Sequence, residues 1–257
     1  MRGGKISTKK TMKDPQRKSG ASSQSGMPPN KQGRCVAASP KHNHLAVCSN
    51  LGKVSIRALD DFDKKFTSLK DAKEWCEVAK YSPDEQYLAV GSHDQHMYVY
   101  KIDGETHEYS LVCTDHSGTS KILALDWTAD STYIRKSTGD YETLYFDVAN
   151  NKVDAHGSET YAEKIWASNS VKMSPDRRSL NPKGEDGTHI NDNNQTTNGC
   201  QMITGDDFGL VNVFNWPNPD CDRARSFAGH SEHVIRVLPS KDGQRLYSIG
   251  GQDKTII

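Results

Sequence analysis

The sequence contains no apolar stretch long enough to cross a membrane. A spanning helix needs about 18 or more consecutive apolar residues, whereas hydrophobic residues make up only 34% of this chain and form no run of that length. The N-terminus is polar from its first residues, so it lacks the apolar region of a secretory signal peptide. We therefore predict a soluble intracellular protein with no membrane span and no membrane partner.

Known catalytic and metal-binding motifs are also missing. The chain has no Gly-x-x-x-x-Gly-Lys phosphate loop, no Gly-x-Ser-x-Gly elbow and no zincin motif. It has no Cys-x-x-Cys pair, and most cysteines stand in or beside apolar segments, which predicts buried reduced thiols. The cysteines are Cys35, Cys48, Cys76, Cys113, Cys200 and Cys221. We predict a binding module rather than an enzyme, with no catalytic residue, no cofactor and no metal site.

The formal net charge is zero, but the charge is unevenly distributed along the chain. Residues 1–33 carry eight basic side chains, one acidic side chain and almost no large apolar ones, so they cannot bury enough surface to become ordered. We predict a disordered basic head, which is either a plain solvated tail or an electrostatic arm for an acidic polymer. Because no aromatic residues are interleaved, nucleic acid is disfavoured as the partner. The candidate partner-binding residues are Lys5, Lys9, Lys10, Lys13, Arg17 and Lys18.

The stretch from Glu74 to Ile102 has the pattern of short antiparallel strands joined by tight turns. Ser82-Pro83-Asp84 and Gly91–Asp94 are polar turn sequences, and between them lies the short apolar segment Tyr87–Val90. The following segment, Met97–Ile102, is rich in the β-branched and aromatic residues of a strand. The stretch predicts most of a four-stranded antiparallel sheet.

This pattern recurs along the chain. With Asp94 as the reference, a Val-Tyr pair follows five and six residues later, and similar pairs follow the equivalent residues of other stretches. The successive reference residues are Leu51, Asp94, Asp140, Phe208 and Asp253, at intervals of 43, 46, 68 and 45 residues. A four-stranded repeat of about 40–45 residues is typical of a β-propeller blade. We predict an all-β propeller with about five visible blades and an insertion in the longest interval.

The predicted propeller covers residues 34–257. Its units lie near 34–69, 73–103, 116–149, 186–217 and 229–257, and residues 150–185 are the insertion, in which 165–167 form a possible strand. Five units, with the first and last counted as incomplete, are fewer than the seven of the usual ring. Because an open arc leaves strand edges unpaired, we expect a piece of a longer repeat protein that is unstable alone or assembles with another chain.

Two histidine and aspartate pairs resemble a feature of WD-repeat propellers. In those proteins a Gly-His near the first strand bonds an Asp in a later turn, which satisfies a partly buried imidazole. His116 precedes Asp140 by 24 residues, and His230, in Gly229-His230, precedes Asp253 by 23. We predict that these four residues and Asp94 stabilise their blades rather than bind a ligand.

Several segments resemble the echinoderm microtubule-associated protein-like family, a branch of the WD-repeat propellers. The resemblance covers roughly residues 34–257, although no unit carries the Trp-Asp dipeptide, and residues 1–33 show neither heptads nor an apolar motif. It implies microtubule association, with tubulin and other proteins as partners, in the cytoplasm and cytoskeleton and possibly in cilia or spindles. The segments are KEWCEVAKYSPDEQYLAVGSHD (73–94), ALDWTADSTYIRKSTGDYETLYF (124–146), DGTHIN (186–191), GDDFGLVNVF (205–214) and GHSEHVIRV (229–237).

Three functions from different classes are compatible with these observations. The first is a microtubule-associated scaffold in which the propeller binds proteins and the basic head adds attraction to acidic tubulin tails. The second is a general protein-interaction adaptor without direct microtubule binding. The third is a hydrolase hidden in a propeller, which would need acidic or histidine residues gathered on one rim. The sequence favours the first.

Overall fold

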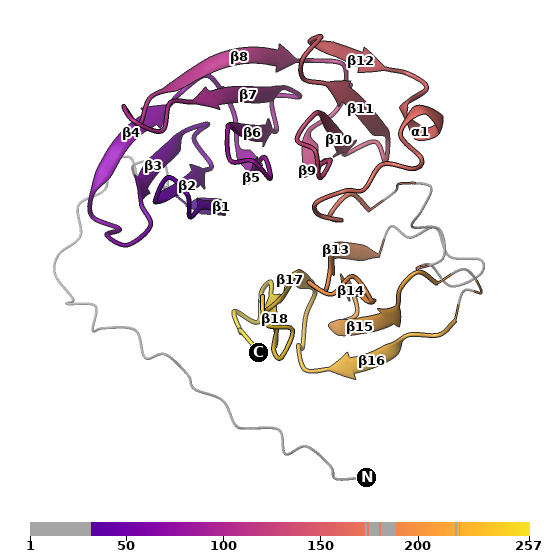
Figure 1. Ribbon diagram of the computed structural model, residues 1–257. Coiled ribbons are helices and arrows are strands. Elements are labelled where there is room, and N and C mark those ends of the chain that lie inside the picture. Colours follow the sequence, from indigo (N-terminus) through magenta and orange to yellow (C-terminus); the bar gives the residue numbers. More distant parts are fainter. Residues whose placement is uncertain (1–31, 173, 175–179, 181–188, 219, 221) are drawn as a thin grey trace, which may run out of the picture.

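The strands of the protein form a series of small antiparallel sheets placed one after another around a common centre (Figure 1). The computed structural model describes residues 32–172, 174, 180, 189–218, 220 and 222–257. No helix within these residues is long and apolar enough to span a membrane. The arrangement confirms the predicted all-β propeller.

Three complete four-stranded sheets lie in the first part of the chain. The first contains β1 (Gly33–Ser39), β2 (His44–Ser49), β3 (Val54–Ala58) and β4 (Lys65–Leu69). The second contains β5 (Cys76–Tyr81), β6 (Tyr87–Ser92), β7 (Met97–Ile102) and β8 (Tyr109–Asp115). The third contains β9 (Ile122–Trp127), β10 (Tyr133–Thr138), β11 (Thr143–Asp147) and β12 (Lys152–Asp154), followed by the short helix α1 (Gly157–Thr160).

Two further sheets lie in the last part of the chain. The fourth contains β13 (Ile190–Gln195), β14 (Gln201–Asp206), β15 (Leu210–Asn215) and β16 (Arg225–Ala228). The fifth contains β17 (Val234–Pro239) and β18 (Leu246–Gly250), and Ile256 adds an isolated bridge to Ile249. In each sheet the first strand lies nearest the centre, and β5 packs against β1 and β9 as β17 packs against β13 (Figure 1).

The sheets differ from the predicted units in three ways. The first sheet has all four strands, so the expectation that it is incomplete was wrong. The outermost strands β8, β12 and β16 lie beyond the predicted ends of their units, because their exposed, mixed sequences lack the apolar alternation that marks inner strands. The possible strand at 165–167 is only a single bridge between Trp166 and Thr128.

The polar segment at the start of the fourth unit is the inner strand β13. Asparagine and aspartate are depleted in strands, but here tertiary partners satisfy them. Asp192 accepts a hydrogen bond from the Val237 backbone amide at 2.9 Å, and Asn193 Nδ2 donates to the Asn169 carbonyl at 2.7 Å.

The same backbone hydrogen bond fixes the turn between the second and third strands of every sheet. An amide in this turn donates to a carbonyl 18 residues earlier, just before the first strand, as in His93 to Trp75 at 2.8 Å. The other four bonds are Asn50 to Gln32, Gly139 to Lys121, Asp207 to His189 and Gly251 to His233, at 2.8–3.0 Å. All five turns therefore lie beside the connections between sheets, on one face of the propeller, which we call the turn face.

The residue after each reference position of the repeat has a left-handed backbone. These residues are Gly52, Gln95, Tyr141, Gly209 and Lys254, with φ between 52° and 77°. Two of them also leave no room for a side chain, because a Cβ atom would lie 2.2 Å from the Ala72 carbonyl oxygen at Gly52 and 2.7 Å from that of His230 at Gly209. The register predicted from the sequence is thus the register of the turns.

On the opposite face, a hydroxyl group closes the turn between the first and second strands. Ser82, Thr128, Thr196 and Ser240 each donate to a carboxylate or amide oxygen two residues later, at 2.5–2.7 Å. Each also accepts the backbone amide five residues later, at 2.9–3.1 Å. In the second sheet this is the Ser82-Pro83-Asp84 turn that the sequence predicted. In each of these sheets the turn orients the inner strand.

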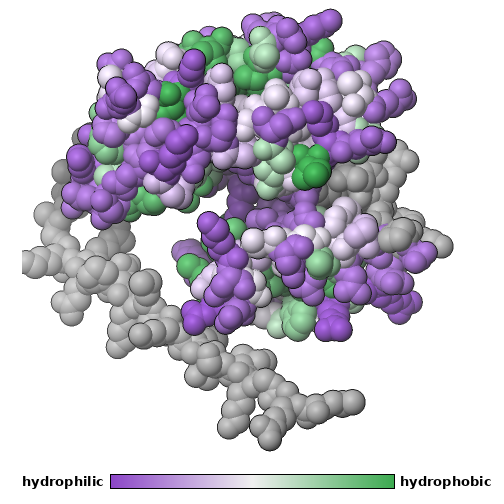
Figure 2. Space-filling model, viewed as in Figure 1, coloured by the Kyte–Doolittle hydropathy of each residue, from purple (hydrophilic) through white to green (hydrophobic). Residues whose placement is uncertain are grey.

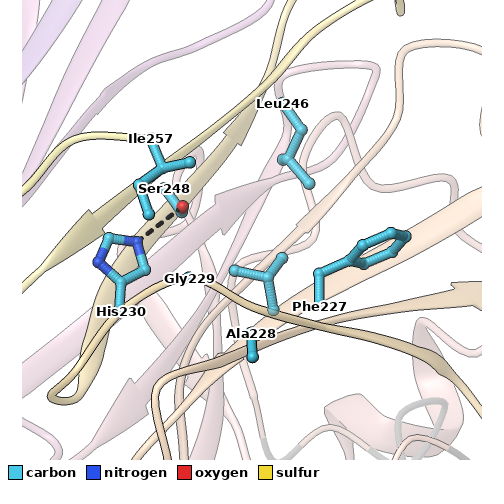
Figure 3. A pocket seen from close by; sticks show the side chains of 8 residues that line it. Phe227, Ala228, Gly229, His230, Leu246, Ser248 and Ile257 are labelled. Atoms are coloured by element: carbon cyan, nitrogen blue, oxygen red, sulfur yellow. Dashed lines mark hydrogen bonds between the residues drawn. The ribbon is translucent and has the colours of Figure 1, made fainter. Parts of the chain in front are cut away.

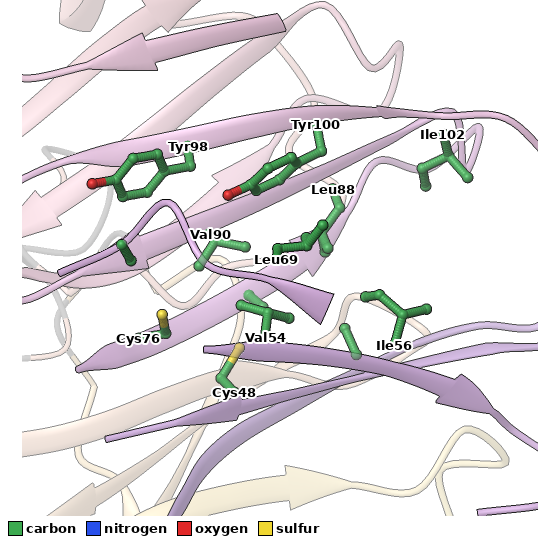
Figure 4. Close-up of a cluster of buried hydrophobic side chains, with 13 residues drawn as sticks. Cys48, Val54, Ile56, Leu69, Cys76, Leu88, Val90, Tyr98, Tyr100 and Ile102 are labelled. Atoms are coloured by element: carbon green, nitrogen blue, oxygen red, sulfur yellow. The ribbon is translucent and has the colours of Figure 1, made fainter. Parts of the chain in front are cut away.

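The core consists of side chains packed between neighbouring sheets. Strand β7 contributes to two clusters in alternation, because successive side chains of a strand point to opposite sides: Tyr98 and Tyr100 face the first sheet, whereas Met97 and Val99 face the third. Figure 4 shows the first of these clusters, in which the Tyr100 hydroxyl also donates to Asp71 at 2.8 Å. Trp127 is 1% exposed, as predicted for a core residue.

Most of the cysteines take part in this packing. Cys48, Cys76 and Cys113 are buried free thiols, and burial raises the pKa of Cys76 to about 12 and that of Cys113 to about 11. Cys35 is partly buried, and Cys200 is exposed, so the prediction of buried thiols was wrong for Cys200. Cys221 lies outside the described residues.

A buried carboxylate holds the segment 168–171 against the third sheet. Asp126 is fully buried and lies 3.0 Å from Lys80 Nζ and 3.1 Å from Arg135 Nε. It also accepts the backbone amides of Ser170 and Val171 at 2.9 Å. Burial opposes its ionisation, but the two cations and these amides lower its pKa below the usual range. Part of the predicted insertion therefore belongs to the centre of the propeller.

The contact of Asp126 with Val171 matches that of Asp192 with Val237. Each carboxylate accepts a backbone amide 45 residues later, at 2.9 Å. The segment 168–171 thus occupies, beside β9, the place that β17 occupies beside β13. Asn169 continues the contact to the fourth sheet through Asn193.

Replacement of Asp126 by Asn should strongly destabilise the protein. The change leaves the buried Arg135 and the partly exposed Lys80 without their counter-charge, which costs on the order of 3–5 kcal/mol. The matched change Asp130→Asn removes a carboxylate that pairs with Lys164 at the surface, where an ion pair contributes at most about 1 kcal/mol. Urea unfolding of both variants measures the difference, and equal losses would contradict the role of Asp126.

A buried histidine joins the first sheet to the second. His44 is 0% exposed; its Nδ1 lies 2.8 Å from the Tyr109 hydroxyl, and its Nε2 lies 2.8 Å from His107 Nδ1. Burial lowers the pKa of His44 to about 4, with smaller contributions from the nearby His107 and His42. The neutral imidazole is therefore the form that the fold accommodates.

This burial predicts a loss of stability in mild acid. A histidine whose pKa is lowered by folding stabilises the protein above its ordinary pKa of about 6.5, and this contribution falls as the pH drops towards about 4. Between pH 7.5 and pH 5 the unfolding free energy should fall by about 2 kcal/mol through this group. In His44→Phe the pH dependence of thermal unfolding should be smaller, whereas in His116→Phe, at an exposed histidine, it should match wild type.

Candidate interaction face

The turn face carries exposed apolar side chains at the reference positions of the repeat. Leu51 and Phe208 stand where the other sheets have aspartate, and they are 42% and 68% exposed. Tyr141, one residue after its reference position, is 57% exposed. The sequence contained this signal, since an apolar residue in a polar turn position is unexpected, but the sequence analysis used these residues only to set the register.

A groove lies on the turn face between the first and second sheets. It has a volume of about 530 Å³ and is lined by Asn50, Leu51, Lys73, Glu74, Trp75 and His93. Trp75 is 42% exposed; the guanidinium of Arg34 lies 3.9 Å from its ring centre, and the ring of His93 lies 5.1 Å away. No local sequence pattern marks this site, because Arg34, Trp75 and His93 come from different strands and connections.

Asp94 closes the turn beside this groove. Its carboxylate accepts the Lys73 backbone amide at 2.8 Å, the Tyr98 hydroxyl at 2.9 Å and the His96 backbone amide at 3.1 Å. Burial opposes ionisation of Asp94, but these hydrogen bonds hold its pKa below the usual value. The side chain thus links a turn to the connection before β5, which is compatible with the predicted structural role.

His230 and Asp253 are hydrogen bonded in the fifth sheet. His230 Nδ1 lies 3.0 Å from Asp253 Oδ2 and 2.9 Å from Thr255 Oγ1, while its Nε2 lies 2.8 Å from Ser248 Oγ (Figure 3). The order Ser-His-Asp resembles a catalytic triad, but the imidazole is only 1% exposed. The adjoining pocket of about 130 Å³ is smaller than the roughly 300 Å³ at which ligand pockets usually begin. The arrangement therefore fits a blade-stabilising contact.

His116 does not make the predicted contact with Asp140. His116 is exposed, and Asp140 accepts a hydrogen bond from the Thr119 hydroxyl instead. The backbone bonds of the turn face explain the error, because they make Lys121 equivalent to His233. His230 lies three residues before His233, whereas the residue three before Lys121 is Gly118. His116 is thus two residues out of register with His230.

The remaining site residues predicted from the sequence are six basic side chains of the head. Lys5, Lys9, Lys10, Lys13, Arg17 and Lys18 lie outside the described residues. Within the described part, no group of three or more histidine, cysteine, aspartate or glutamate side chains is arranged to hold a metal ion. One face of the molecule is mainly hydrophilic, with small separate apolar patches (Figure 2).

Repeated four-stranded sheets around a common centre, with turns fixed in one register, define a β-propeller. Residues 17–257 match a family described as Echinoderm microtubule-associated protein second beta-propeller. The chain belongs to this family. The match begins inside the predicted head of residues 1–33.

Individual relatives agree with this assignment. A ciliary WD repeat-containing protein, ctxp80, from Euplotoides octocarinatus is 42% identical over 93% of this chain and 33% of its own length. The 77 kDa echinoderm microtubule-associated protein of Strongylocentrotus purpuratus is 39% identical over 71% of this chain and 27% of its own. Echinoderm microtubule-associated protein-like 3 of Homo sapiens is 34% identical over 87% and 25%. The chain thus spans a third or less of these relatives.

A solved structure shows the same fold. A chain in the crystal structure of the mitotic checkpoint complex superposes with a TM-score of 0.52, covering 86% of this chain and 59% of that chain. Its sequence identity of 10% supports the fold alone.

Replacement of His230 by Ala should destabilise the fifth sheet. The change leaves Asp253 and Ser248 without their shared buried partner, which costs about 1–3 kcal/mol. His233→Ala is the matched control, because His233 is about half exposed and its contact with Asp207 contributes less than about 1 kcal/mol. Chemical denaturation compares the two, and the structural role would be rejected if they lost the same stability.

Proposed function

We propose that this chain is part of a microtubule-associated scaffold, in which the propeller binds tubulin or partner proteins. The observation that carries the proposal is the match of residues 17–257 to the second propeller of the echinoderm microtubule-associated proteins. Relatives named as microtubule-associated and as ciliary support a cytoplasmic, cytoskeletal location that includes cilia.

The basic head would add electrostatic attraction to acidic tubulin tails. Residues 1–33 have a formal charge of +7, from eight basic residues and one acidic residue. Attraction between exposed charges is screened over about 8–10 Å at physiological ionic strength. This contribution should therefore weaken as salt is added.

A general adaptor without direct microtubule binding is the second candidate. The apolar side chains of the turn face favour it, because Leu51, Tyr141 and Phe208 are exposed in a way that suits contact with another protein. In this case other proteins would bind the propeller while microtubules would not. Neither candidate requires catalysis, and we propose no enzymatic activity.

Co-sedimentation with microtubules tests the proposal. Residues 1–257 and residues 34–257 should both pellet with microtubules at low and at physiological salt if the propeller itself carries binding. Pelleting of the longer chain alone, and only at low salt, would reduce the role to a weak arm. Failure of both to pellet would contradict direct binding and leave the adaptor.

Neutralising the head should lower microtubule affinity at least several-fold at low salt, because six favourable charges are lost. The variant replaces Lys5, Lys9, Lys10, Lys13, Arg17 and Lys18 by Ala. A control variant replaces three exposed lysines of the propeller, Lys101, Lys152 and Lys241, by Ala. Unchanged affinity of the six-residue variant, measured by co-sedimentation at several salt concentrations, would remove the head from the mechanism.

A further inference from the structure

The groove between the first and second sheets has a guanidinium and an imidazole beside it, each with a buried nitrogen that forms no hydrogen bond within the described residues. Arg34 Nε and His93 Nε2 are buried and form no hydrogen bond with any described residue. Both lie near Glu77, at 3.9 Å and 3.3 Å, without hydrogen bonding to it. Buried polar atoms are nearly always paired in native proteins, so the buried Arg34 Nε, which is always a donor, indicates an absent acceptor.

The carboxylate of Glu77 does not fill this role. It lies near the guanidinium groups of Arg34 and Arg236 and the imidazole of His93, and all three contacts, at 3.9, 3.7 and 3.3 Å, are too long or poorly oriented for a hydrogen bond. The guanidinium of Arg34 donates no hydrogen bond within the described residues, and a quarter of its side chain is exposed. Its planar set of N–H groups is suited to donate two hydrogen bonds to a second carboxylate in bidentate geometry.

The rim of the groove adds both charge and apolar surface. Lys73 and Glu74 are exposed on the rim, where their charges offset each other, so the partly exposed guanidinium of Arg34 supplies the positive charge beside the groove. Trp75 and Leu51 are each 42% exposed and provide the apolar walls. A volume of about 530 Å³ lies in the range of sites that hold a peptide side chain or small ligand.

We propose that this groove binds an acidic peptide segment of a partner protein. A carboxylate of the segment accepts hydrogen bonds from Arg34, and a neighbouring leucine or aromatic side chain packs between Leu51 and Trp75. Charge complementarity selects the acidic residue, and the exposed indole selects the apolar one. The site does not depend on the proposed microtubule role, because any protein with such a segment can occupy it.

A binding assay without tubulin tests this inference. The probe is a fluorescein-labelled peptide with two glutamates on each side of one leucine, and binding to the full chain is followed by fluorescence anisotropy. Two reference peptides carry glutamine in place of glutamate or alanine in place of leucine. The first peptide should bind at least ten-fold more tightly than either reference, and its affinity should fall as salt is added.

Variants then locate the binding. Arg34→Gln and Leu51→Ala should each weaken binding about ten-fold or more. Phe208→Ala should change it less than two-fold, because Phe208 is exposed at the equivalent turn of the fourth sheet but lies outside the groove. Lys73→Glu alters only an exposed charge on the rim and should also weaken binding, so the test holds even if Arg34→Gln fails to fold. Thermal unfolding checks each variant.

Several results would overturn the inference. Absence of binding by the wild-type chain would do so, as would equal binding of the glutamine peptide. Unchanged affinity in both Arg34→Gln and Lys73→Glu would place any binding elsewhere. Since the assay contains no microtubules, its outcome is separate from that of co-sedimentation.

Discussion

The backbone hydrogen bond that spans 18 residues in each sheet is the contact on which the rest of the structure depends. It ties the turn between the second and third strands to the connection before the first, and it recurs in all five sheets. A backbone bond of this kind tolerates nearly any side chain, so the blades keep one geometry while their sequences diverge. It also gathers the turns on one face, where His93 is brought beside Trp75 and the groove is formed.

Side chains reinforce this frame differently in each sheet. Asp94 binds the connection through the Lys73 amide, whereas Asp253 uses His230. In the first and fourth sheets the same position holds Leu51 and Phe208, which stabilise no such contact and remain exposed. Since the backbone bond fixes the turn in all five sheets, an aspartate is not required at this position.

Electrostatics at the centre serve two separate purposes. Asp126 is fully buried and is hydrogen bonded to Lys80, Arg135 and the backbone amides of Ser170 and Val171, so its charge is paired. Around Glu77 the contacts with Arg34, His93 and Arg236 are 3.3–3.9 Å long, and none of them is a hydrogen bond. A satisfied buried network holds sheets together, while an unsatisfied one near the surface retains the capacity to bind. Burial and pairing therefore separate structural charges from candidate binding charges in this protein.

The sequence by itself determined the all-β propeller, the register of its turns and the Ser-Pro-Asp motif, because period-two apolar strands and turn residues are local signals that recur at fixed spacing. Only the tertiary structure decided the ends of the outer strands, the inner position of 168–171, and Thr119 rather than His116 as the partner of Asp140. It also decided the groove, since Arg34 and Trp75 meet only when β1 packs on β5. Contacts between sheets depend on how strands pack around the centre, which no local pattern records.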